Sequence, residues 1–123
     1  ARLARQRRVT EAFMAASREG DLERLIAVLD PDVVLHSDAA ASPSGVPLMV
    51  RGAAAVAGGA RAASARARYG RIALVNGTPG LIVAPRGRLM VALAFTFSGD
   101  KISQIDVIGE PDRLAALDLA VLD

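Results

Sequence analysis

The chain's only histidine, His36, stands two residues before Asp38, and this pair is a candidate for acid–base chemistry. In a strand, residues two apart point to the same face, with their Cα atoms about 6.6 Å apart. A histidine and a carboxylate that share a face could exchange a proton with a bound substrate. A lone histidine more often has a structural role, with water or the backbone as its partner, so both interpretations stay open.

Two further polar residues could serve a pocket. Tyr69 is the only tyrosine, and its hydroxyl could donate a hydrogen bond to a ligand, although packing at a pocket rim is its commoner role. Asp106 lies in an apolar segment. Burial on an apolar face would raise the pKa of its carboxyl group, which suits a general base. The alternative for Asp106 is an ordinary, fully bonded carboxylate near a strand end.

The composition excludes several classes of site. The chain has no cysteine and one histidine, so thiolate catalysis, disulfides and zinc–thiolate centres are excluded and a transition-metal site is not expected. It has no phosphate-binding glycine motif and no serine nucleophile elbow. We therefore expect no metal and no cofactor. A net charge of +2 and 3% aromatic residues argue against direct nucleic-acid binding. No apolar run is long enough for a membrane span, and we expect a cytoplasmic protein.

The first third of the chain predicts two helices. The first covers residues 2–19 and stops at Gly20; it carries apolar residues at helical spacing, namely Val9, Phe13 and Ala16. Asp21 is a good N-cap for the second helix, which should end at Asp30-Pro31. Four arginines crowd the first turns of the first helix, where the helix dipole disfavours cations. We therefore expect residue 1 to lie within a longer chain.

The rest of the chain predicts mainly strands. Residues 33–38 form the first strand by alternation, and residues 39–47 form a loop. An alanine-rich helix is expected over residues 52–66, with Gly58-Gly59 as a weak point. Further strands are expected at residues 48–50, 71–76, 81–84, 89–98 and 101–109. A last helix starts at Pro111 and carries the apolar stripe Leu114, Leu117 and Val121. The whole chain, residues 1–123, reads as one α+β domain.

The turn Gly99-Asp100 joins the two longest strands and leaves two registers open. A regular two-residue hairpin would place Gln104 and Asp106 on the face that the helices cover. A slip or bulge of one residue would place Ile105 and Val107 there instead. Turn chemistry favours the first register and hydrophobicity favours the second.

This order of elements resembles the nuclear transport factor 2-like, or SnoaL-like, fold, in which a curved sheet forms a cone around a pocket. Within that fold, the sequence resembles the C-terminal domain of a group of extracytoplasmic-function sigma factors. Residues 7–13 with Gly20-Asp21 are similar to the group's first helix pair, and residues 76–81 to its central turn. Residues 106–114 are similar to its closing Asn-Pro-Asp-Lys-Leu segment. Glu110 departs from that motif, and Arg113 replaces its lysine.

The same group carries an Asp-Gly-Gly-Gly-Lys loop after the first strand, which is implicated in regulation. Asp38 matches its first residue, but three alanines and a serine follow at residues 39–42. The resemblance therefore implies a divergent or stand-alone member, whose control differs from the usual one.

The resemblance implies a non-catalytic regulatory domain of an alternative sigma factor. Its partners would be the sigma core domains and, through them, RNA polymerase and promoter DNA. The residues expected to make regulatory contacts are Asp38, Pro111, Asp112, Arg113 and Leu114. The residues expected to line the pocket are His36, Asp38, Tyr69, Phe95, Gln104 and Asp106. A small apolar ligand could occupy that pocket, and a homodimer could form through Ala92, Ala94 and Thr96.

The alternative is an enzyme. The fold also occurs in small SnoaL-like isomerases, cyclases and hydrolases that act on apolar substrates. Asp106 resembles the position from which such enzymes abstract a proton, and the His36/Asp38 pair could act as the base instead. The sequence favours the non-enzymatic interpretation and leaves the enzymatic one open.

Overall fold

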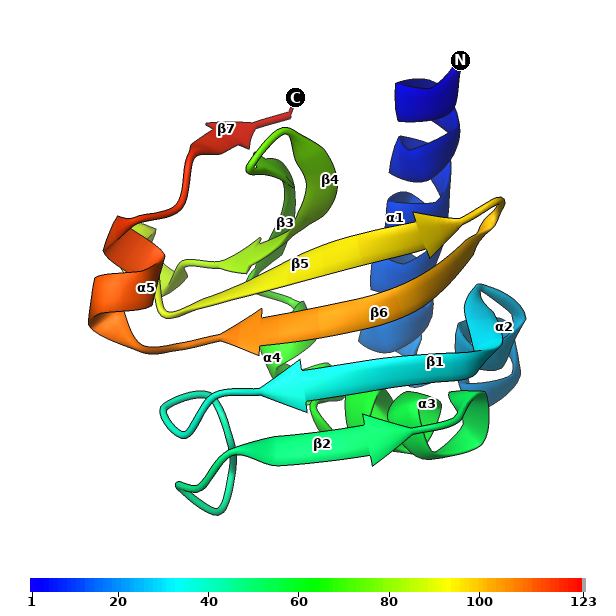
Figure 1. Cartoon of the computed structure of the whole chain (residues 1–123), viewed down its shortest axis with the longest axis horizontal. Helices are drawn as coiled ribbons and strands as arrows, with labels where there is room; N and C mark the ends of the chain where they lie inside the picture. Colours follow the sequence, from blue (N-terminus) through cyan, green and yellow to red (C-terminus); the bar gives the residue numbers. More distant parts are fainter. Residues whose placement is uncertain (123) are drawn as a thin grey trace.

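The computed structural model describes residues 1–122, without the side chain of Val121. One curved sheet holds its strands in the order β2-β1-β6-β5-β4-β3-β7 (Figure 1). β1 and β6 are parallel, and the other neighbours are antiparallel. The strands are β1 (Leu29–Ser37), β2 (Leu48–Arg51), β3 (Gly70–Val75), β4 (Thr78–Val83), β5 (Val91–Ser98), β6 (Lys101–Ile108) and β7 (Leu119–Val121).

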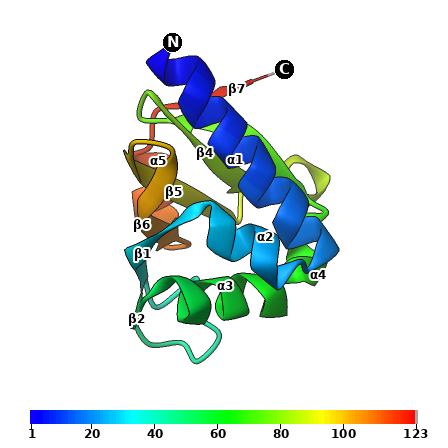
Figure 2. The ribbon, with the colours of Figure 1, turned by 90° about the vertical axis from the view of Figure 1, so that its right-hand side faces the viewer.

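Three helices pack on one side of the sheet, a short fourth helix packs against them on that side, and a fifth lies at the other side of the sheet (Figure 2). They are α1 (Arg2–Glu19), α2 (Leu22–Ala27), α3 (Ala53–Ala62), α4 (Ser64–Ala67) and α5 (Pro111–Ala115), with a short 3-10 turn at Pro85–Gly87. The predicted α+β plan, with helices over one face of a curved and mostly antiparallel sheet, is confirmed.

The first helix forms as predicted. The second begins as predicted but ends at Ala27 rather than at Asp30-Pro31, because the chain from Leu29 onward belongs to β1, where Leu29 pairs with Ile102 of β6. Gly20 ends α1 in the left-handed conformation, at φ 65°. The Asp21 side chain accepts a hydrogen bond from the Arg24 amide at 3.2 Å and caps α2. Phe13 of α1 meets Phe95 of β5 edge-to-face, with ring centroids 5.3 Å apart. These contacts fix α1 across the concave face of the sheet.

The alanine-rich helix breaks at a different place from the predicted one. α3 runs through Gly58 and Gly59 without interruption and ends at Ala62, and Ala63 separates it from α4, which begins at Ser64. Val56 and Ala57, on the inner side of α3, are almost completely buried. The small side chains let α3 lie close to β1 and α2, and this packing outweighs the cost of two helical glycines.

A β-bulge resolves the register of β5 and β6. Next to the turn, Phe97 pairs with Ile102, as a two-residue hairpin requires. Ser103 is then skipped, so that Phe95 pairs with Ile105. Both isoleucines are completely buried. One extra residue thus satisfies both the turn and the apolar core.

The chain after β6 does not form the predicted long helix. α5 ends at Ala115, and residues 119–121 pair with β3 as a seventh strand. Asn76 holds this segment through two hydrogen bonds to Asp118. The Asn76 side-chain oxygen accepts from the Asp118 backbone amide at 2.9 Å, and the Asn76 backbone amide donates to the Asp118 carbonyl at 2.8 Å. Leu114 and Leu117 cover Ala73, Ile82 and Ala92 on the side of the sheet away from α1.

Candidate functional site

A cavity of about 630 Å³ lies between the concave face of the sheet and the helices. Its size is in the range of small-molecule sites, about 300–1,000 Å³. The walls are mainly hydrocarbon. They include Phe13 of α1, Val56 of α3, and Leu35, Leu93, Ile105 and Val107 of the sheet. The bulge at Ser103 matters here, because it turns Ile105 and Val107 towards the cavity.

A few polar groups reach this cavity. Ser17 of α1 lines it and is 6% exposed, and its hydroxyl has no hydrogen-bond partner among the described residues. The Ser37 hydroxyl donates to the Asp38 carbonyl at 3.1 Å. Arg66 and Tyr69 also line the cavity and are exposed. Arg66 is the one charged residue among the described residues of the wall.

Of the six residues predicted to line the pocket, Tyr69 alone lies in the wall of this cavity. Phe95 is buried in the core between Phe13 and Phe97. His36, Gln104 and Asp106 lie on the opposite surface of the sheet, which we call the outer face. The alternation was predicted well for β1. For β6 the hairpin register would have placed Gln104 and Asp106 inside, and the bulge places them outside.

On the outer face, His36 and Asp106 are register partners in the parallel pair β1–β6. The Gln104 amide donates to the Asp106 carboxylate at 3.2 Å, and His36 is exposed. Asp38 does not share this surface, because the chain leaves β1 after Ser37. The predicted His36/Asp38 pair is therefore replaced by a different neighbourhood for each residue. Of the three residues proposed as a dimer surface, Ala92 is completely buried, which removes it from such a role.

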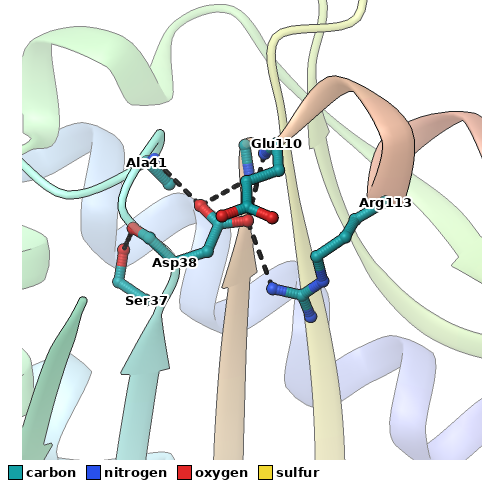
Figure 3. Close-up of polar contacts among 6 residues, drawn as sticks. Ser37, Asp38, Ala41, Glu110 and Arg113 are labelled. Atoms are coloured by element: carbon teal, nitrogen blue, oxygen red, sulfur yellow. Dashed lines mark hydrogen bonds and ion pairs between the residues drawn. The ribbon is translucent and has the colours of Figure 1, made fainter. Parts of the chain in front are cut away.

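Asp38 is the centre of a buried polar cluster (Figure 3). Its side chain is 6% exposed. Its carboxylate accepts hydrogen bonds from the amides of Ala41 at 2.9 Å, Gly109 at 2.9 Å and Glu110 at 3.0 Å. The Arg113 guanidinium adds a contact of 3.2 Å. We call these five residues the Asp38 junction. It joins the loop after β1 to the start of α5, more than 70 residues later in the chain.

The junction keeps its carboxylate ionised. Burial alone would raise the pKa of Asp38, but the amides of Glu110, Gly109 and Ala41 and the Arg113 charge together outweigh burial and lower it. Each of these donors favours the charged form. A carboxylate whose oxygens are all occupied in this way serves as a structural clamp rather than as a general base.

The residues at 109–113 divide into buried and exposed parts. Gly109 fits against Ala41 so closely that a Cβ atom there would lie 2.8 Å from the Ala41 amide nitrogen. Pro111 and Asp112 are exposed, and the Arg113 side chain is 48% exposed. Of the predicted contact residues, the structure thus brings Asp38 and Arg113 into direct contact. The sequence did not point to Gly109 or Ala41, since their roles depend on contacts far along the chain.

Within residues 1–122, no helix is long and apolar enough to cross a bilayer. The same part of the chain holds no group of three or more acidic, histidine or cysteine side chains that could bind a metal ion.

Comparison with known proteins gives matches to solved structures. No family model and no curated protein matches the sequence. The Mycobacterium tuberculosis extracytoplasmic function sigma factor SigJ is 28% identical over 89% of this chain, with a TM-score of 0.72. This chain spans 44% of that sigma factor chain.

Two other structures share the fold at lower identity. A SnoaL-like protein of unknown function from Burkholderia thailandensis is 14% identical, with a TM-score of 0.60, over 87% of this chain and 96% of its own. A putative isomerase from Bacillus subtilis is also 14% identical, with a TM-score of 0.58, over 90% of each chain. The chain is therefore a SnoaL-like domain of nuclear transport factor 2-like fold, related to an extracytoplasmic function sigma factor.

Proposed function

We propose that this chain is a non-catalytic regulatory domain of an alternative sigma factor, which acts on transcription initiation by docking on the sigma core. The observation that carries this proposal is the similarity to a sigma factor over nearly the whole chain. RNA polymerase and promoter DNA would be reached through the sigma core, and the cytoplasm is the expected compartment.

The Asp38 junction suggests how such a domain presents a contact surface. The Asp38 carboxylate is buried, so it would shape the surface rather than touch a partner. Pro111 and Asp112 project from the start of α5, beside the partly exposed Arg113, and Leu114 anchors this segment against the outer face. We assign the contact with the sigma core to this segment and to the adjoining loop, residues 39–47.

The enzymatic alternative has less support from the geometry. It needs a base at the apolar cavity, and the proposed bases Asp106 and His36 lie on the outer face. The third, Asp38, is occupied by its own hydrogen bonds. The likeness to a putative isomerase shows a shared fold, and activity does not follow from fold alone.

The test is calorimetric titration of this chain into the sigma core domains encoded by the same gene. Weak binding suffices, because a tether supplies an effective concentration in the millimolar range. We expect saturable binding that Asp112→Ala weakens about tenfold. The control is Asp32→Ala, at an exposed aspartate in the first half of β1. A gene that encodes no sigma core, or equal binding by both variants, would contradict the proposal.

A further inference from the structure

The Ser17 hydroxyl is unusual because it is buried and still lacks a partner. The backbone carbonyl of Ser17 accepts from Gly20 at the end of α1, but its side-chain oxygen has no hydrogen bond among the described residues. Buried hydroxyl groups are usually bonded, since leaving one unpaired costs about 1–3 kcal/mol. This hydroxyl lines the cavity. A molecule within the cavity is therefore the natural source of its missing partner.

The rest of the cavity restricts what that molecule can be. Its walls are largely aliphatic and aromatic, and no carboxylate or histidine is found among the described residues that line it. A charged group placed against such a wall would lose its hydration without compensation. Arg66 is exposed and could not supply a dry partner for a buried anion. The walls therefore fit a neutral hydrocarbon body.

One wall of the cavity is also part of the Asp38 junction. Ala40, Ala41, Ser42 and Pro43 line the cavity, and the Ala41 amide donates to Asp38. Gly109 packs directly against Ala41. A ligand that presses on residues 40–43 would therefore act on the hydrogen bonds that hold residues 109–113.

We propose that the cavity binds a neutral, mainly hydrocarbon small molecule with one hydroxyl or carbonyl oxygen bonded to Ser17, and that residues 40–43 couple its binding to the Asp38 junction. This inference adds a ligand to the regulatory role proposed above and rests on that role only for its biological consequence. Ligand binding is measured on this chain alone, so failure of the ligand site and failure of sigma-core docking are separate results.

The first experiment uses the neutral fluorescent probe N-phenyl-1-naphthylamine, whose emission rises in apolar sites. Its displacement is measured with naphthalene, 2-naphthol and 2-naphthoate. We expect 2-naphthol to bind most tightly, because it alone combines a neutral body with a hydrogen-bonding oxygen. Ser17→Ala should weaken 2-naphthol about three- to tenfold and leave naphthalene unchanged. Ser98→Ala, at an exposed hairpin serine, is the matched control.

Two variants fill the cavity from opposite sides. Val107→Phe adds volume from β6 and Ala60→Leu adds volume from α3, both at half-buried positions in the wall. Either variant that retains the circular dichroism of the unmodified chain should lose probe binding at least tenfold. Unchanged probe binding in a folded filling variant, no saturable probe binding, or tighter binding of 2-naphthoate than of 2-naphthol would overturn the site.

The coupling has its own readout. Amide hydrogen exchange at Gly109 and Glu110 should change when 2-naphthol binds, because both amides donate to Asp38. The amides of Ala73 and Ile102, which are buried but do not line the cavity, serve as an internal reference. Binding of 2-naphthol with unchanged exchange at Gly109 and Glu110 would overturn the coupling.

Discussion

Asp38 and Asp106 are two carboxylates near neighbouring strands, and the structure gives them opposite surroundings. Asp38 lies just beyond β1, is buried, and accepts from three backbone amides and an arginine. Asp106 lies within β6, on the outer face, where the Gln104 amide is its partner. Both are plausible bases in the sequence. Neither residue lines the cavity. The Asp38 oxygens are occupied by the junction, and Asp106 faces away from the cavity.

The comparison also separates two kinds of polar group in this molecule. The polar atoms of the Asp38 junction are satisfied by the chain itself, so the junction holds two distant segments together. The Ser17 hydroxyl in the cavity is not satisfied. A fully bonded buried group holds the fold together, whereas an unbonded one requires a separate explanation, which the proposed ligand supplies.

The largest expected effect is the loss of the Asp38 carboxylate. Asp38→Ala leaves three backbone amides without their acceptor, so we expect the free energy of unfolding to fall by about 3 kcal/mol. Asp106→Ala removes the hydrogen bond from Gln104 on the outer face and should lower the free energy of unfolding by less than about 1 kcal/mol. Urea denaturation of the two variants measures the difference. Equal losses would mean that the junction contributes no special stability.

Replacing two glycines by alanine should change the free energy of unfolding by smaller amounts, and in opposite directions. Gly109→Ala forces a Cβ atom against the backbone of Ala41, and we expect a loss of about 1–3 kcal/mol. Gly58→Ala adds a Cβ atom in open space within a helix and should stabilise the chain by up to about 1 kcal/mol. Thermal unfolding compares them. A neutral Gly109→Ala variant would show that the loop and the strand end are not tightly packed.

The smallest effect is the pH dependence of the junction. The pKa of Asp38 in the folded chain lies below its ordinary value of 3.8. Its stabilisation is therefore complete above that value and is lost as the pH falls through the folded-state pKa. Asp38→Asn cannot titrate, so the stability advantage of the unmodified chain over this variant should shrink below about pH 4. Urea denaturation at pH 7, 4 and 3 measures it, and a constant difference would refute the role assigned to the ionised carboxylate.

Local signals predicted most of the elements. Gly20 ends the first helix and Asp21 caps the second. Alternation in β1 correctly placed Leu35 and His36 on opposite faces of the sheet. The same signals failed where contacts with a distant segment determine the local structure. Nothing near Ala115 in the sequence stops the last helix there. Asn76 holds the following segment in place by bonding Asp118, which lies 42 residues further along the chain. The candidate site was predicted less well, because the faces of Gln104 and Asp106 depended on one residue of register.

The sequence by itself determined the fold class, because periodic apolar residues, caps and turn residues act over a few positions and leave little choice of element. Through the family resemblance, it also pointed to Asp38 and residues 111–114 as contact residues. The tertiary structure alone decided what these residues do. The bulge at Ser103 exists because a tight turn and a buried apolar face demand different registers. The bonds of Asp38 to Gly109 and Glu110 exist because the parallel pairing of β1 and β6 brings the ends of those strands together.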